Sequence, residues 1–261
     1  MVRVAAGNSA PGIDQHVRRL MIISVHVPKT AGTTFMHYLQ KSFPGGVLGD
    51  YGEDTQVSYL FDSCFDDLAG ANKPGQSQLS LVSEGILKCR RAVVEKGIQV
   101  IHGHFGITKY LGVFPDATYV VWLRHPLERT LSEYYHHKRF ADSPYWAIYD
   151  RELTFEQWMA IDWHVNLQHR LTNGDLSKFH FVGISEEFDE SLSEFSRLVG
   201  VAENGADLHI SPVNINPEKE IHRNYEVGNE TRERFIELNQ LDMALYGDAV
   251  DRFERDRNRS R

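Results

Sequence analysis

Residues 24–36, SVHVPKTAGTTFM, gather side chains that suit the binding of a phosphate group. Lys29 precedes Gly32, and the hydroxyls of Thr33 and Thr34 follow. The first N–H groups of a helix lack intrahelical acceptors and attract anions, and a glycine lets the backbone approach closely. The segment therefore predicts a phosphate-binding loop between a strand and a helix. The triphosphate-binding pattern GxxxxGK[ST] is not found in it.

A second segment, VWLRHPLERTLSEYY at residues 121–135, offers an arginine and a hydroxyl. Arg124 stands where an apolar run ends, and Ser132 follows eight residues later, about two turns into the next helix. An arginine fork and a hydroxyl at such a place could hold a second phosphate. Taken alone, Arg124 fits a structural ion pair and Ser132 an ordinary helix position equally well.

Two histidines in IHGHFG could act on a proton. In an extended segment, residues i and i+2 face the same way, so His102 and His104 would reach one point. An imidazole with an ordinary pKa of about 6.5 suits the removal of a proton from an alcohol at neutral pH. We predict His104 as the base and His102 as the group that orients it, although the spacing also allows the reverse.

The elements that must position these residues alternate between strands and helices. Strands are expected at 21–27, 98–101, 118–123 and 179–184, and a long loop or short hairpins at 44–80. Helices are expected from 33 or 34, at 81–96, 126–138, from 154, at 185–199 and at 229–255. Predicted caps are Thr33 or Thr34, Thr154 with Gln157 in a capping box, and Ser185, whose helix ends at Gly200. Such alternation predicts an α/β fold with a central parallel sheet flanked by helices. Ligands bind at the carboxyl ends of the strands in such sheets, and the chemistry-bearing residues fall there.

The bulk properties limit the class of protein. The chain has 261 residues, a formal net charge of −8 and two cysteines, Cys64 and Cys89. The net charge argues against a general nucleic-acid binder, and the two cysteines are expected to be free thiols. We expect a flexible leader at 1–20, one domain at 21–255 and a frayed tail at 256–261. No signal peptide and no transmembrane segment is recognisable, which predicts a cytoplasmic protein.

The pair PKTAGTT and LRHPLERTLSEYY resembles the sulfotransferases that use 3′-phosphoadenosine 5′-phosphosulfate, with their P-loop-like fold. The resemblance implies that the 5′-phosphosulfate is bound by Lys29, Thr30, Ala31, Gly32, Thr33 and Thr34. It assigns the 3′-phosphate to Arg124 and Ser132, and a late basic loop over the nucleotide to Lys219 and Arg223. Lys29 would also act in catalysis, on the bridging oxygen. No metal is expected, because sulfate carries less charge to neutralise than a phosphate chain.

Further segments are similar to the carbohydrate branch of that family, in particular to heparan sulfate 2-O-sulfotransferase, in a bacterial-type form. They are IHGHFG, NLQHRLTNG at 166–174, FVGISEEFDESLSEF at 181–195 and LDMALYGDAV at 241–250. The resemblance implies a carbohydrate, a glycolipid or another alcohol as the acceptor, and adenosine 3′,5′-bisphosphate as the product. Two alternatives stay open: a P-loop nucleotide or sugar kinase, and a module that binds a nucleotide or glycan without turnover.

Overall fold

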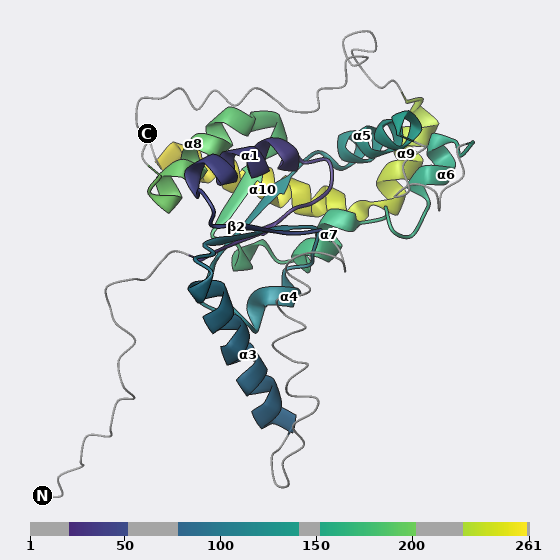
Figure 1. Ribbon diagram of the computed structural model, residues 1–261. Helices are drawn as coiled ribbons and strands as arrows, with labels where there is room; N and C mark the ends of the chain where they lie inside the picture. The colour runs from purple at the N-terminus through teal and green to yellow at the C-terminus, as the bar shows by residue number, and fades with distance from the viewer. Residues whose placement is uncertain (1–20, 52–77, 141–151, 202–226, 260–261) are drawn as a thin grey trace, which may run out of the picture.

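A central sheet of five parallel strands organises the computed structural model, which describes residues 21–51, 78–140, 152–201 and 227–259 (Figure 1). The strand order is β2-β3-β1-β4-β5. The bounds are β1 Ile22–Val25, β2 Val47–Asp50, β3 Val100–Gly103, β4 Thr118–Leu123 and β5 Phe181–Ile184. The predicted α/β fold with a central parallel sheet is thereby confirmed. Lys219 and Arg223 lie outside the described residues.

The strands are apolar on both sides because helices cover both faces of the sheet. In β1, Ile23 and Val25 belong to one core, whereas Ile22 packs into the other. Ser24 shares the second face, and the β1–β3 register sets it beside His102. A polar pair is thus buried at the end of an otherwise apolar face, close to the loop that follows β1.

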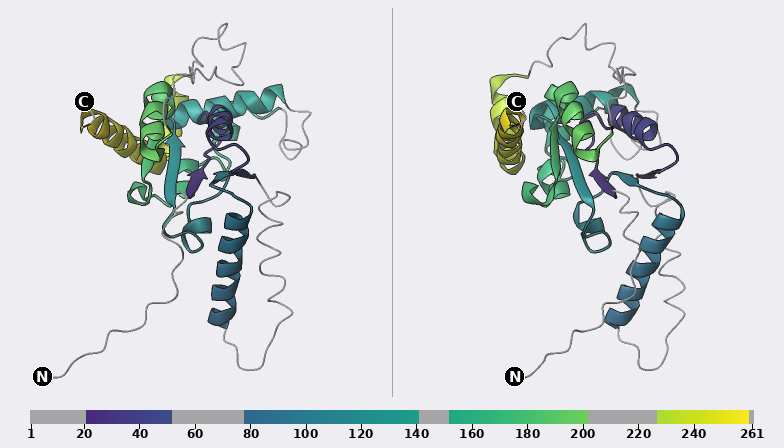
Figure 2. Two further views of the ribbon diagram at one scale, coloured as in Figure 1. Left: turned by 60° about the vertical axis from the view of Figure 1, so that its left-hand side comes forward. Right: turned by 90° about the vertical axis from the view of Figure 1, so that its left-hand side faces the viewer.

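Two helices cover the face that carries Ser24. Helix α1 spans Gly32–Ser42 and α8 spans Phe188–Val199. The Tyr38 hydroxyl lies 2.7 Å from Ser196 Oγ, and the rings of Phe35 and Phe195 meet edge to face at 5.0 Å. Figures 1 and 2 show the two helices side by side above the sheet. These contacts fix the start of α1 relative to the strands.

The opposite face packs against α10, Gln240–Arg259, and against α4, Thr108–Leu111. Apolar residues of α10, among them Leu245 and Phe253, join the core formed by β4 and β5. Helix α3, Gln78–Glu95, meets this core through Val93 and otherwise projects away from the body (Figures 1 and 2).

A third group of helices lies at one end of the sheet. It consists of α5 Pro126–Arg139, α6 Phe155–Met159 and α9 Asn229–Leu238, clustered together in Figure 1. Their shared core contains Leu127, Leu131, Phe155, Met159 and Phe235. Helix α7, Leu167–Thr172, packs against α10, which also contacts α5 and α9. Helix α5 begins at Pro126, shortly after β4 ends at Leu123.

The expectation of a long loop or short hairpins at 44–80 is wrong at both ends: Val47–Asp50 form the parallel edge strand β2, and α3 already begins at Gln78. Gly103 makes the pairing possible, because a Cβ at that position would lie 1.7 Å from the Asp50 carbonyl oxygen. The expected strand at 98–101 begins and ends two residues later, as Val100–Gly103. His102 therefore lies within the strand instead of after it.

Helix ends differ from expectation where a side-chain cap is predicted. Ala31, not a threonine, is the N-cap of α1, and Ser185 begins a 3-10 turn, Ser185–Glu187, before α8 starts. The capping box of Thr154 with Gln157 is confirmed, as is the end of α8 at Gly200, which has φ of 66°. Tertiary contacts override local capping preferences at the first two sites.

Helix α10 continues to Arg259, into residues predicted to be frayed. Phe253 is buried in the core and holds the helix one turn before those residues. Within the described parts of the chain, no helix combines the length and the apolar character that crossing a membrane requires. The cytoplasmic location stays a prediction.

Candidate active site

The loop between β1 and α1 has the backbone of an anion-binding site. Lys29 and Ala31 adopt positive φ angles of 69° and 65°, a conformation that costs a non-glycine residue about 1–2 kcal/mol. Such strain persists where the surrounding structure enforces it, and it is frequent at functional sites. Left-handed residues next to right-handed ones turn successive N–H groups into one concavity. Helix α1 begins directly after this loop, at Gly32.

The three threonines of the loop have different environments. Thr30 is fully buried, and its hydroxyl donates to the Val27 carbonyl at 2.8 Å. Thr34 is also buried, whereas Thr33 is exposed. The Thr30 side chain therefore stabilises the loop from inside. Thr33 offers a solvent-accessible hydroxyl at the helix start.

Lys29 is half-buried in a crowded electrostatic environment. The pKa of Lys29 is lowered to about 8, chiefly by burial and also by the nearby Arg139, Arg124 and Arg129, whereas the Glu133 carboxylate raises it. A bound anion would favour the charged form of this lysine and raise its pKa again, because an opposite charge nearby offsets the cost of burial.

Arg124 follows β4 and reaches back to the loop. Its Nη1 donates to the Lys29 carbonyl oxygen at 3.3 Å, so the arginine and the loop lie side by side. The Gln168 side-chain amide bonds to both polar groups of the Arg124 backbone. Its Nε2 donates to the Arg124 carbonyl at 2.8 Å, and its Oε1 accepts from the Arg124 N–H at 3.1 Å. Gln168 was not predicted as a site residue. It is a buried polar residue of NLQHRLTNG, and only the fold brings it to Arg124.

Ser132 lies on α5 and is half-buried. It follows Pro126, the first residue of that helix, by about 9 Å along the axis. No hydrogen bond joins Ser132 to Arg124. Arg124 Nη2 lies 3.9 Å from Glu128 Oε2, which is a long distance for an ion pair. The structural ion pair that the sequence left open is thus weak, and the guanidinium stays available beside the loop.

The α7 and α10 segments act as a scaffold for Arg124. Asp242 on α10 accepts from the N–H groups of Gln168 at 3.2 Å and His169 at 2.7 Å, which caps the start of α7. The Asn166 side chain accepts from the Asp242 N–H at 3.0 Å. The segments NLQHRLTNG and LDMALYGDAV are joined by these bonds. They hold Gln168, and Gln168 holds Arg124.

His102 and His104 meet through a third histidine, His26. The His26 ring stacks on His102 with centroids 4.9 Å apart and lies 4.5 Å from His104. His102 is only 1% exposed, and its Nδ1 is 2.8 Å from Ser24 Oγ. His104 is exposed, and its N–H donates to the Asp50 carbonyl at 2.8 Å. The predicted convergence of two histidines is therefore a cluster of three.

The sequence reasoning missed His26, although a signal for it exists. His26 follows Ser24 by two residues, so strand alternation places it on the same face. Once β1 pairs with β3, that face carries His102. Neither the pairing of β1 with β3 nor the register of that pairing was predicted from the sequence. Without the register, nothing in the sequence places His26 next to His102.

All three rings favour the neutral form. Burial lowers the pKa of His102 to about 3, with a contribution from His104. Burial lowers the pKa of His104 to about 4, while the carboxylates of Glu133 and Asp50 oppose this shift. The pKa of His26 falls well below its usual range for the same reason. A neutral imidazole accepts a proton, and His104 is the ring that solvent reaches.

The histidines do not form a metal centre. In the described part of the chain, no three histidine, cysteine, aspartate or glutamate side chains are arranged to hold a metal ion. The stacked geometry of His26 on His102 also differs from ligands that converge on one point. That the reaction needs no metal stays a prediction.

Glu133 is a third residue that sequence reasoning missed, after Gln168 and His26. It is buried on α5, where it accepts from Arg129 Nη1 at 2.6 Å and lies 3.3 Å from His164 Nδ1. Burial alone would raise the pKa of Glu133, but Arg129 and His164 lower it to about 2. The i,i+4 spacing of Arg129 and Glu133 predicts an ion pair, yet its burial is set by the packing of α5.

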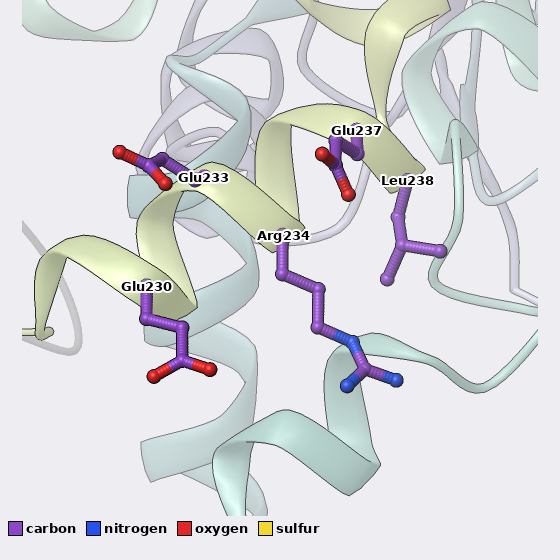
Figure 3. Close-up of a pocket in the computed structure, with 5 residues that line it drawn as sticks. All are labelled: Glu230, Glu233, Arg234, Glu237 and Leu238. Atoms are coloured by element: carbon purple, nitrogen blue, oxygen red, sulfur yellow. The ribbon is translucent and has the colours of Figure 1, made fainter.

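A surface pocket on α9 has the wrong chemistry for a phosphate. It is lined by Glu230, Glu233, Arg234, Glu237 and Leu238, and Figure 3 shows their side chains along a single helix. Three carboxylates against one guanidinium repel an anion. None of these residues is among those predicted for the site, so we place the candidate site at the β1–α1 loop.

The comparisons with known proteins show the family. Residues 17–247 match the profile of the sulfotransferase family. A sulfotransferase from Alicyclobacillus acidocaldarius is 15% identical over 88% of this chain and 94% of that one, with a TM-score of 0.45. A mouse sulfotransferase, SULT7A1 complexed with PAP, is 14% identical over 90% of each chain, also with a TM-score of 0.45. None of the curated proteins matches the sequence.

Proposed function

Because this chain belongs to the sulfotransferase family, we propose that it transfers a sulfuryl group from 3′-phosphoadenosine 5′-phosphosulfate to a hydroxyl group. One observation carries the proposal. The strained loop at Lys29 and Ala31 leads into the start of α1, and a solvent-accessible neutral histidine, His104, follows the adjacent strand β3. A cationic anion-binding loop beside a proton acceptor is the arrangement that this transfer requires.

The donor would be bound by the loop and by Arg124. The N–H groups at the start of α1 would bind the 5′-phosphosulfate, as helix starts bind anions, with the exposed Thr33 hydroxyl beside them. Lys29 would stabilise the charge that develops on the bridging oxygen. Arg124 and Ser132 would hold the 3′-phosphate. Closure by Lys219 and Arg223 stays a prediction.

The transfer itself would depend on positioning and electrostatics. His104 would take the proton of the acceptor hydroxyl as the acceptor oxygen bonds to sulfur. The bond between sulfur and the 5′-phosphate oxygen would break, and its electron pair would leave with adenosine 3′,5′-bisphosphate. His102 would hold its place beneath the cluster through Ser24 instead of reacting, because it is buried.

The acceptor is proposed to be a carbohydrate or glycolipid hydroxyl. The resemblance of IHGHFG and the later segments to the carbohydrate branch supports this class. The net charge of −8 favours an acceptor with few anionic groups over a long polyanionic glycan. Transfer of radiolabelled sulfate to a panel of neutral and anionic glycans and glycolipids would identify the class.

Calorimetric binding of nucleotides tests the donor assignment. The chain should bind adenosine 3′,5′-bisphosphate more tightly than AMP, and Arg124→Ala should remove most of that preference, about 1.5–3 kcal/mol for a charge-assisted contact. Arg197→Ala, which removes an exposed arginine on α8, is the matched control and should keep the preference. Equal affinity of the wild-type chain for both nucleotides would contradict the 3′-phosphate site.

A further inference from the structure

His26 lies between the loop and the predicted base, and the proposed reaction gives it no role. Its backbone N–H donates to the Gly103 carbonyl at 2.8 Å, which extends the pairing of β1 with β3 by one residue. The ring is half-buried, and among the described residues its Nδ1 has no hydrogen-bond partner. Buried polar atoms without partners are uncommon, so a ring kept here is expected to serve a purpose.

The His26 ring packs directly against the first residue of α1. A Cβ added to Gly32 would lie 1.8 Å from His26 Nε2, far inside any real contact. The space that glycine leaves at position 32 is therefore filled by the imidazole. Gly32 begins the helix whose start we propose as the donor site, so the ring is held against that site.

The same ring contacts the predicted base. His26 and His104 have centroids 4.5 Å apart at an interplanar angle of 49°. The Tyr51 ring meets His104 edge to face at 4.9 Å and His26 at 5.9 Å. His26 also stacks on His102, which Ser24 fixes inside the sheet. The position of His104 is thus set by rings that are themselves anchored to the strands.

We propose that His26 is a positioning residue whose ring sets the distance between the start of α1 and His104. This role rests on the proposed sulfuryl transfer. Reacting atoms must lie about 3–3.5 Å apart and in line, so a small displacement of the base slows the reaction without weakening the binding of the nucleotide. The role needs the shape of the ring and no proton transfer to it.

The test compares His26→Ala with His26→Phe, which keeps an aromatic ring but cannot take up a proton. His37→Ala is the matched control, because His37 is an exposed histidine on α1. For each variant, kcat at saturating donor, the acceptor KM, the calorimetric Kd of adenosine 3′,5′-bisphosphate and the thermal unfolding midpoint are measured. The pH profile of kcat is recorded as well.

The expected result separates kcat from binding. His26→Ala should lower kcat about 30-fold or more with less than about a threefold change in the bisphosphate Kd. His26→Phe should recover most of kcat, and His37→Ala should match the wild type. The acidic limb of the His26→Ala profile should move to higher pH, because loss of the neighbouring ring reduces the burial that lowers the pKa of His104. A structural role alone would not move this limb.

Other outcomes overturn the proposal. Equal losses of kcat in the alanine and phenylalanine variants would mean that the imidazole itself reacts, and wild-type kcat in both would mean that the ring positions nothing. If His26→Ala does not fold, a loss above tenfold in folded His26→Phe overturns it. A wild-type chain that binds the bisphosphate but transfers no sulfate to any acceptor would contradict the proposed function instead. The packing of His26 against Gly32 can still be tested in that case. Gly32→Ala should lower the unfolding midpoint less in the His26→Ala variant than in the wild-type chain, because the added methyl group no longer meets the imidazole.

Discussion

Two groups of titratable side chains have members that interact electrostatically with Lys29, and the groups differ in whether their buried members carry a charge. Arg129, Glu133 and His164 form one group. The Glu133 carboxylate accepts from Arg129 Nη1 at 2.6 Å and lies 3.3 Å from His164 Nδ1. His26, His102 and His104 form the other, where rings stack on rings and burial keeps the pKa of each low.

The difference shows how one fold keeps the Glu133 carboxylate ionised and the His104 imidazole, the proposed base, neutral. A buried charge needs a partner, and Glu133 stays ionised because Arg129 and His164 compensate its charge. Among the described residues, the histidines have no carboxylate partner in hydrogen-bonding contact, and burial favours their neutral form. The ion pair keeps a buried charge in the fold, whereas the neutral rings suit the base that we propose.

The largest expected effect comes from breaking the paired group. Glu133→Gln keeps the shape of the side chain but leaves the fully buried Arg129 without its counter-charge. We expect the free energy of unfolding to fall by about 3–5 kcal/mol, as for other buried pairs that lose one member. Denaturation in guanidinium chloride measures this change.

A second ion pair with the same i,i+4 spacing supplies the control. Glu128 lies 3.9 Å from Arg124 and is 45% exposed. Glu128→Gln should change the free energy of unfolding by less than about 0.5 kcal/mol, because exposed pairs contribute little. If the two variants lost similar stability, burial would not be what distinguishes the paired group.

The next effect sharpens the neutrality of the histidine group. The pKa of His102 is about 3 in the folded chain, below its ordinary value of about 6.5. The unfolded chain therefore takes up the proton first, and the contribution of His102 to stability is complete above about pH 6.5 and is lost as the pH falls towards 3. Between pH 6.5 and 5 the loss amounts to about 2 kcal/mol.

His102→Asn should remove that part of the pH dependence, whereas His37→Ala should retain it, since His37 is exposed. The measurement is the free energy of unfolding in urea at pH 7, 6 and 5 for the wild-type chain and both variants. An unchanged slope in His102→Asn would show that His102 is not kept neutral by the fold.

A smaller effect concerns Lys29, which lies between the two groups. With a pKa of about 8, Lys29 is charged below that pH and loses its charge above it. The affinity for adenosine 3′,5′-bisphosphate should therefore be constant up to about pH 7 and fall by about tenfold towards pH 9.5. Lys29→Arg keeps the charge over this range, so its affinity should not change with pH. The same decline in both proteins would assign the titration to another group.

Much of this arrangement is predictable from local sequence. Apolar runs that end before Pro28 and Arg124 predict β1 and β4, and the P-loop-like sulfotransferase fold is confirmed by the parallel sheet and the family match. The residue types of the loop from Lys29 to Thr34, and of the later Arg124, are enough to predict them as candidate site residues. Their chemistry depends on the chain within a few residues, which is the range over which sequence patterns are informative.

The rest depends on contacts between distant segments. His26 becomes part of the site only through the register of β1 with β3, and Gln168 becomes the support of Arg124 only when α7 packs against α10. The edge strand β2 was missed because it is short and polar at its end, and it pairs only because Gly103 leaves room for Asp50. None of these contacts leaves a periodic pattern in the sequence.

The most direct test of the central claim is the turnover of His104→Ala beside that of His102→Ala, with the Kd of adenosine 3′,5′-bisphosphate measured by calorimetry for both. Loss of a general base typically lowers kcat by about 10²–10⁴-fold. We predict a loss in that range for His104→Ala with an almost unchanged Kd, and a milder loss for His102→Ala, which is buried against Ser24. Normal turnover by His104→Ala would contradict the account.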